Sequence, residues 1–201
     1  MGLVGATWGM AKLASAPSGK VVTLANAVSD SDWIKGKIDA KVVLVEYSDF
    51  QCPACFSYAT VVNRIVEEFG DKIAFVYRHF PLPYHQQAGL AARAAEAAGK
   101  QGKFWEMVDL IFVSQKDWAE KSNARETFVS YAKLLNLDMN QFGTDLDSAA
   151  VKKKVENDYL SGAAIVGGTP TFFLNGERIE KNPQSYEAFR ELILQKLNQN
   201  P

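Results

Sequence analysis

The sequence predicts an α/β fold in which an all-helical block separates a βαβ unit from a ββα unit. Two runs of β-branched and apolar residues, 41–50 and 72–79, enclose a segment with helical spacing. Helical patterns then continue from about residue 86 to residue 160, and a hairpin signal with one more helix closes the chain. Because a strand, a helix and a strand joined by short links pair in parallel, the first elements form a right-handed βαβ unit. An insertion within one small α/β domain explains this order better than two consecutive domains.

Composition excludes several classes of protein. The chain has 201 residues, of which 47% are hydrophobic, so it can bury a core and is not globally disordered. Lysine and arginine (22) nearly balance aspartate and glutamate (23), which leaves a net charge of −1. This balance provides no electrostatic attraction for a polyanion, so we expect no nucleic-acid partner.

The first half of the chain contains the clearest strand signal. Residues 41–50 (KVVLVEYSDF) start as a near-continuous β-branched run, which is typical of a strand buried on both faces of a sheet. A turn follows, and the segment 54–69 has its apolar residues at helical spacing before Gly70, a favourable residue at a helix C-terminus. The inward positions of this helix are Tyr58, Val61, Val62, Ile65, Val66 and Phe69.

The middle of the chain is predicted to be helical throughout. Asn123 followed by Glu126 matches a capping box, which predicts the start of a helix. The four helices are expected at residues 87–98, 103–113, 124–135 and 144–160.

The last part of the chain returns to strands. Residues 171–175 (TFFLN) form a short β run, and the pair Asn175-Gly176 is a strong two-residue hairpin signal before a return strand at 177–180. The segment 184–198 closes the chain as an amphipathic helix. Its inward residues are predicted to be Tyr186, Phe189, Leu192, Ile193 and Leu197.

These elements divide the chain into three parts. Residues 20–85 and 161–201 form the α/β domain, and residues 86–160 form the helical insertion. Residues 1–19 are mostly small and apolar, but they are fewer than the roughly 20 apolar residues that span a bilayer. They also lack the positive start of a secretory signal. We expect either a flexible leader or the tail of a truncated N-terminal membrane anchor.

The two cysteines of the chain, Cys52 and Cys55, indicate chemistry rather than a structural framework. A disulfide between them closes almost no loop and would stabilise the fold little. Cys52 follows the buried strand at the first turn of a helix, where unpaired N–H groups and the helix dipole favour a thiolate. Pro53 suits the first helical position. Cys55 lies one turn inward on the same face and is the natural resolving thiol.

A zinc site is the alternative interpretation of the cysteine pair. A closed structural zinc site needs four ligands, and the remaining soft ligands of this chain are His79 and His85. Their spacing does not form a finger, so we expect no metal site.

Three stretches resemble the DsbA-like oxidoreductases, an extracytoplasmic branch of the thioredoxin superfamily. They are VEYSDFQCPAC, YRHFPLPYHQQAGLAARAAEAAGKQGKFWEM and VGGTPTFFLNGE, which together cover about residues 37–180 in the family's order. The resemblance implies a thioredoxin fold, βαβ…ββα, with an all-helical insertion between its halves. It also implies a location in the periplasm or on the outer face of the cytoplasmic membrane. No cofactor is expected besides the redox-active disulfide Cys52–Cys55.

The resemblance implies roles for residues outside the cysteine pair. Glu46 matches the buried acid that exchanges a proton with the second thiol, and a lone carboxylate within an apolar strand is expected to have a raised pKa. Pro170 matches the family's cis-proline, and Thr169 before it is expected to tune substrate release. Pro53 and Ala54, between the cysteines, are further candidate substrate contacts. The alternatives are an exposed surface glutamate and an ordinary turn proline.

Four other residues could be considered for a catalytic role, but we expect them to be secondary or structural. Asp49 is closer to the cysteines than Glu46 but lies in the turn, so it ranks below Glu46 as the proton-exchanging acid. His79 ends a strand and is more typical of a satisfied core or edge residue. Trp105 is most simply part of the insertion core, and His85 belongs to no recognisable catalytic constellation.

The predicted activity is dithiol–disulfide exchange with cysteine-containing substrate proteins, assisted by a separate redox partner. The preferred direction is donation of a disulfide, by a monomer. The Pro-Ala dipeptide lacks the histidine of many family members, so we expect an enzyme less oxidising than DsbA, between DsbA and thioredoxin. The alternatives are a reductase or isomerase on the same fold, and a redox-sensing thioredoxin-like binding module.

Overall fold

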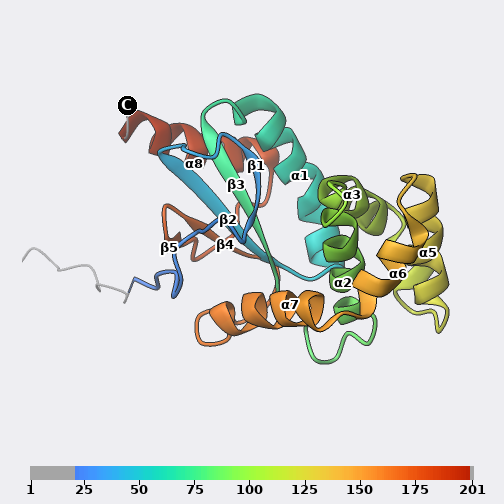
Figure 1. The fold of residues 1–201 in the computed structure, drawn as a ribbon. Helices are drawn as coiled ribbons and strands as arrows, with labels where there is room; N and C mark the ends of the chain where they lie inside the picture. The colour runs from blue at the N-terminus through green and yellow to red at the C-terminus, as the bar shows by residue number, and fades with distance from the viewer. Residues whose placement is uncertain (1–20, 200–201) are drawn as a thin grey trace, which may run out of the picture.

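The computed structural model describes residues 21–199, so the predicted leader or anchor, residues 1–19, lies outside the described residues. This part of the chain contains a five-stranded sheet with the strand order β1-β3-β2-β4-β5 (Figure 1). The strands are β1 (Trp33–Gly36), β2 (Val42–Ser48), β3 (Ile73–His79), β4 (Thr171–Leu174) and β5 (Glu177–Arg178). Within the same residues we find no helix whose length and apolar character would let it cross a membrane.

The central strand β2 confirms the predicted buried strand. It pairs in parallel with β3 and antiparallel with β4, so Glu46 lies opposite Tyr77 on one side and Phe172 on the other. The strand ends at Ser48, and Asp49 begins the turn that leads to helix α1 (Pro53–Phe69). Parallel β2 and β3 joined through α1 form the expected βαβ unit.

Strand β1 was not predicted. It is a four-residue edge strand, WIKG, that pairs antiparallel with β3. Its residues are only partly buried, so the sequence lacks the apolar run or strict alternation by which a strand is recognised. Besides its pairing with β3, the strand contacts the insertion through Trp33, whose ring stacks on Phe104 at 4.3 Å.

Alternate residues of β2 face two different cores. Leu44 packs on the side of α1 and the C-terminal helix α8 (Tyr186–Gln199), where Phe189 and Ile193 are buried. Val45 and Tyr47 face the opposite core, with Val76 and Phe173. Glu46 therefore shares the Leu44 face, which is the face of the cysteine-bearing helix.

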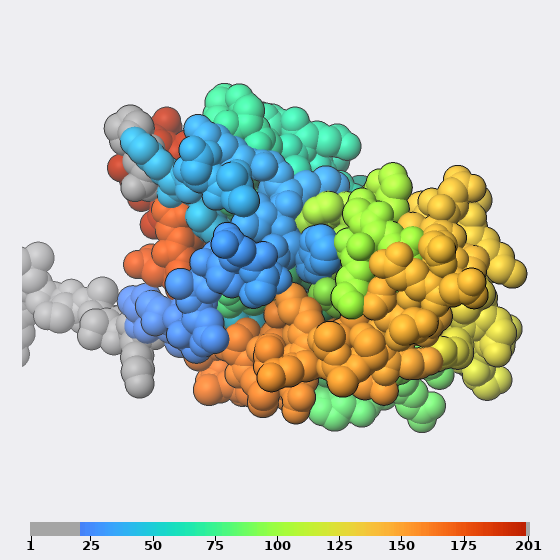
Figure 2. Space-filling view, in the orientation of Figure 1, coloured from blue at the N-terminus to red at the C-terminus, as the bar shows by residue number. Residues whose placement is uncertain are grey.

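The predicted helical insertion is confirmed and lies mostly beside one end of the sheet (Figure 1; Figure 2). Helix α7 runs back along the sheet from this block. The helices are α2 (Ala88–Gly99), α3 (Phe104–Val113), α4 (Gln115–Trp118), α5 (Ala124–Leu134), α6 (Met139–Asp147) and α7 (Ala149–Gly162).

Two predictions within the insertion were wrong. The single helix expected at 144–160 is two helices, because Ser148 has an extended backbone (ψ 147°) and its hydroxyl accepts the N–H of Val151, starting α7 anew. Asn123 does stand at the N-terminus of α5, but it makes no side-chain cap. Its backbone (ψ 24°) is not extended, the conformation in which a capping side chain reaches the first turn.

The C-terminal hairpin follows the predicted turn chemistry. Asn175 (φ 49°) and Gly176 (φ 84°) both have positive φ, as a type I′ turn requires. The return strand β5 is shorter than the predicted 177–180.

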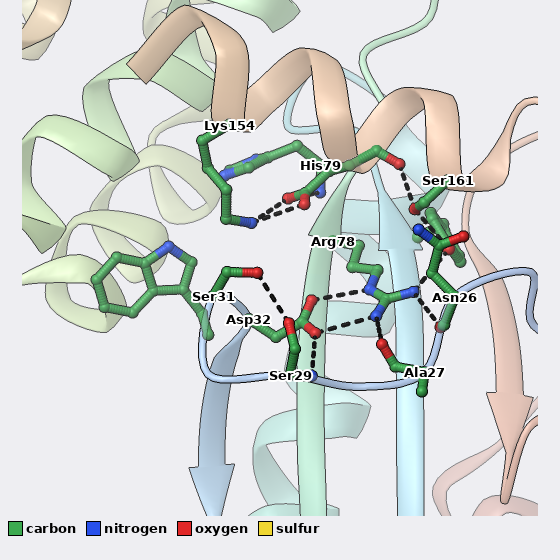
Figure 3. Close-up of polar contacts among 12 residues, drawn as sticks. Asn26, Ala27, Ser29, Ser31, Asp32, Arg78, His79, Lys154 and Ser161 are labelled. Carbon is green, nitrogen blue, oxygen red and sulfur yellow. Dashed lines mark hydrogen bonds and ion pairs between the residues drawn. The ribbon is translucent and has the colours of Figure 1, made fainter. Parts of the chain in front are cut away.

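Arg78 of β3 attaches the segment before β1 to the sheet (Figure 3). Its guanidinium donates to both carboxylate oxygens of Asp32 at 2.8 and 3.0 Å, and to the carbonyls of Asn26 and Ala27. A further bond reaches the hydroxyl of Tyr47 at 3.0 Å. Both charged side chains are 4% exposed, so this is a buried, fully paired ion pair.

Candidate active site

Cys52 is the N-cap residue of α1, directly before Pro53 at the first helical position. Its extended backbone (ψ 122°) turns the chain from the end of β2 into the helix, so the sulfur lies near the unpaired N–H groups of the first turn. The main-chain N–H of Cys52 donates to Asp49 O at 3.1 Å, and Sγ lies 3.4 Å from Thr169 O. The sulfur is therefore held between the helix N-terminus and the loop before β4.

The surroundings of Cys52 lower its pKa from 9.0 to about 5. The largest cause is a hydrogen bond from the Cys55 thiol, which partial burial opposes, and the Thr169 side chain and the N–H groups of Cys55 and Ala54 add to the lowering. The Thr169 hydroxyl is buried and has no hydrogen-bond partner, so its proton is available to the thiolate. Cys52 is thus a thiolate at neutral pH.

Cys55 has the opposite character. It is fully buried one turn inside α1, and burial, the hydrogen bond to Cys52 and the charge of Glu46 all raise its pKa. The main-chain N–H of Asp49 donates to Cys55 Sγ at 3.4 Å. The two thiols, both free in this structure, therefore differ as a nucleophile and a resolving thiol must.

Glu46 is 3% exposed, so the alternative of a surface glutamate is wrong. Burial, the largest cause, and the negative charge of Cys52 raise its pKa from 4.5 to about 7, against a hydrogen bond from Ser48. The carboxyl can therefore hold or release a proton near neutral pH. This confirms the predicted burial and raised pKa, while the role in proton exchange stays a prediction.

The loop before β4 lies beside the cysteines, as the resemblance implied. The Thr169–Pro170 bond is cis, so the alternative of an ordinary turn proline is wrong. A hollow of about 600 Å³ opens here, and Ala54 and Tyr58 of α1 line it together with Thr169 and Pro170. Of the predicted substrate contacts, Thr169, Pro170 and Ala54 line this hollow. Pro53 precedes Ala54 in the chain and is exposed, but it does not line the hollow.

His79 and Trp105 have the structural roles expected of them. His79 is buried, and its Nε2 lies 2.9 Å from Glu96 Oε1. With Asp158 these two form the one metal-ligand-type cluster among residues 21–199, and no cysteine belongs to it. Lys154 Nζ lies 2.6 Å from Asp158 and supplies the positive charge there (Figure 3). Trp105 packs edge-on against the Tyr77 ring at 6.5 Å.

The sequence did not reveal which residues support the cysteine loop. Gln115 of α4 donates from Nε2 to Phe50 O at 2.8 Å and to Cys52 O at 3.1 Å. Gln51 donates to Ala119 O and accepts the N–H of Gln87, both at 2.8 Å. The insertion thus fixes the active-site loop through residues that lie 36 to 68 positions away along the chain, where no local pattern could have indicated it.

Comparison with known proteins identifies a family. The family model described as Thioredoxin matches residues 29–195. The curated relatives include the Na(+)/H(+) antiporter NhaA of Herminiimonas arsenicoxydans, 41% identical over 158 residues that make up 78% of this chain and 24% of the antiporter. NhaA 1 of Mycolicibacterium vanbaalenii is 40% identical over 155 residues, 74% of this chain and 24% of that protein. The chain therefore spans about a quarter of the length of these relatives.

Solved structures share the fold at lower identity. Oxidised BdbD from Bacillus subtilis superposes with a TM-score of 0.76 at 23% identity, covering 90% of this chain and all of that one. The α-DsbA1 protein from Wolbachia pipientis gives 0.73 at 23% identity, covering 86% and 94%. A thioredoxin-like oxidoreductase from Silicibacter pomeroyi gives 0.69 at 21% identity, covering 88% and 94%. The helical insertion is thus part of a fold shared with DsbA-like proteins.

Proposed function

This chain belongs to the thioredoxin family, with the fold of its DsbA-like members, and we propose that it exchanges a Cys52–Cys55 disulfide with the thiols of substrate proteins. The observation that carries the proposal is that the pKa values of two neighbouring thiols are shifted in opposite directions. Cys52 has a pKa lowered to about 5, whereas the pKa of Cys55 is raised. Only the first is therefore charged and nucleophilic at neutral pH.

In the oxidising direction, a substrate thiolate attacks Cys52 Sγ of the disulfide. A mixed disulfide forms, the Cys52–Cys55 bond breaks, and Cys55 leaves as a thiolate that takes up a proton. Glu46, with a pKa of about 7, is the acid placed to supply that proton. A second substrate thiolate then attacks the substrate sulfur of the mixed disulfide, and Cys52 leaves as a stable thiolate. The substrate loses two electrons and the enzyme gains them.

The oxidising direction is supported by the stability of the Cys52 thiolate, which favours the reduced enzyme and makes its disulfide a better oxidant. Typical pKa values of this cysteine are about 7 in thioredoxin and about 3.5 in DsbA. The value of about 5 agrees with an oxidant between the two. We propose that the chain works outside the cytoplasm, because cytoplasmic glutathione would keep the cysteine pair reduced. We also propose that it acts as a monomer. A separate redox partner would re-oxidise it.

The antiport activity named for the curated relatives is not part of this proposal. The matched quarter of those proteins corresponds to the thioredoxin-type segment. We therefore assign to this chain the exchange chemistry of its cysteine pair, which needs neither a metal nor an organic cofactor.

The test is disulfide transfer to a reduced, unfolded protein with several cysteines, followed by the loss of its free thiols. We expect transfer by the oxidised wild type and none by Cys52→Ala. With the same substrate in its disulfide-bonded form, the Cys52 thiolate of Cys55→Ser should attack a substrate disulfide, release one substrate thiolate and accumulate as a mixed disulfide. Equilibration with glutathione buffers then separates oxidant from reductase, since a potential near that of thioredoxin, about −270 mV, would indicate a reductase. Absence of transfer, with Cys52→Ala indistinguishable from wild type, would refute the enzyme and favour a redox-sensing binding module.

A further inference from the structure

Asp49 connects the two cysteines through its main chain. Its carbonyl accepts the N–H of Cys52 at 3.1 Å, and its own N–H donates to Cys55 Sγ at 3.4 Å. In that second bond, a main-chain N–H points at the buried sulfur of Cys55. Since hydrogen-bond donors stabilise a negatively charged acceptor, the position of this N–H affects the energy of a thiolate on Cys55.

The side chain of Asp49 is held by three donors. Its Oδ1 accepts the N–H of Gln51 at 2.6 Å, and its Oδ2 accepts the N–H of Leu82 at 2.7 Å. The third donor is Nδ1 of His85, at 2.8 Å from Oδ2. The carboxylate is fully buried and the imidazole is 18% exposed, so water cannot easily replace this bond.

His85 is the one side chain among these three donors, and it comes from the loop that follows β3. The other two bonds are made by main-chain N–H groups, which a substitution other than proline leaves in place. His85 thus adds a side-chain bond to the main-chain bonds that attach the cysteine loop to the segment 80–87. Losing it leaves Oδ2 with the N–H of Leu82 as its remaining donor, which loosens the position of Asp49 relative to Cys55.

We propose that His85 is a positioning residue for the resolving thiol: through the Asp49 carboxylate it holds the Asp49 N–H on Cys55 Sγ. This inference rests on the proposed function. In that reaction Cys55 leaves as a thiolate when an incoming thiolate opens the Cys52–Cys55 disulfide, and the N–H receives the developing charge. The contribution is therefore to the rate of disulfide opening, more than to the charge of Cys52.

The experiment measures the rate at which reduced glutathione opens the disulfide of the oxidised protein at constant pH. We expect His85→Ala to be slower by about tenfold, since hydrogen bonds to charged sulfur are among the stronger ones. His85→Asn places an amide N–H at the position of Nδ1 and is expected to stay within about threefold of wild type, whereas His85→Gln places it at the position of Nε2 and is expected to be as slow as the alanine variant. The Cys52 thiolate absorbance should titrate alike in all four proteins.

Arg125→Ala is the matched control, because it removes an exposed ion pair with Asp147 within the insertion. It is expected to react at the wild-type rate. Wild-type rates in His85→Ala, or equal slowing by the asparagine and glutamine variants, would overturn the proposal. If the alanine variant fails to fold, the comparison of asparagine with glutamine decides. A wild-type protein that does not react with glutathione would instead refute the proposed function.

Discussion

Replacing Glu46 by glutamine should change how the stability of the protein depends on pH. Glutamine has nearly the same shape, so the substitution removes the titrating group without opening a cavity. In the folded state the pKa of Glu46 is raised from 4.5 to about 7, first of all by burial. Between these values the folded protein keeps a proton that the unfolded chain has released. The free energy of unfolding of the wild type therefore falls as pH rises from 4.5 to 7, and the loss levels off above 7.

The size of this effect follows from the two pKa values. The difference between 4.5 and about 7 corresponds to about 3.4 kcal/mol at pH values well above 7. Between pH 5 and pH 8 the wild type should lose about 2.5 kcal/mol relative to Glu46→Gln. The lowered pKa of Cys52 acts in the opposite direction, because its thiolate stabilises the folded state as pH rises. That contribution is present in both proteins, so the difference retains only the part that comes from the repulsion between the Cys52 thiolate and Glu46.

The assay is unfolding by urea of both proteins under reducing conditions, at pH 5, 6, 7 and 8. The reductant keeps the dithiol form to which these pKa values apply. We expect the difference between the two free energies of unfolding to grow with pH, mostly between pH 5 and 7. Parallel curves, with a constant difference at all four pH values, would refute the conclusion that the folded environment raises the pKa of Glu46.

Three further outcomes are expected. Thiolate absorbance at 240 nm in the reduced protein should titrate with a midpoint near pH 5 and disappear in Cys52→Ala; a midpoint near the ordinary thiol value would contradict the site geometry. Asp32→Ala leaves the buried Arg78 guanidinium without its carboxylate and should lower the free energy of unfolding by about 3 kcal/mol, measured with urea. Gly99→Ala would place a Cβ 2.3 Å from Trp33 Cζ2, so it should cost about 1–3 kcal/mol, and an unchanged melting temperature would show that this contact relaxes freely.

Local patterns in the sequence were sufficient for most of the secondary structure and for the reactive cysteine. A buried strand, a turn and an apolar helical stripe predict that Cys52 stands at a helix N-terminus, because each of these signals involves residues close together in the chain. The same holds for the Asn175-Gly176 turn and for the burial of Glu46 within an apolar strand. The signals were insufficient where an element is short and half-buried, as in β1.

The contacts that set the chemistry of the site come from segments far apart in sequence. Thr169 lies 117 residues after Cys52 and yet contacts its sulfur, and only the resemblance to a family, not periodicity, had indicated this. Gln115 and the His85–Asp49 pair gave no sequence signal of their role. The sequence by itself determined that Cys52 is reactive, since a helix N-terminus is a local feature. The tertiary structure alone decided which donors and charges surround the two sulfurs, because these depend on how the insertion and the β4 loop pack against the end of the central strand.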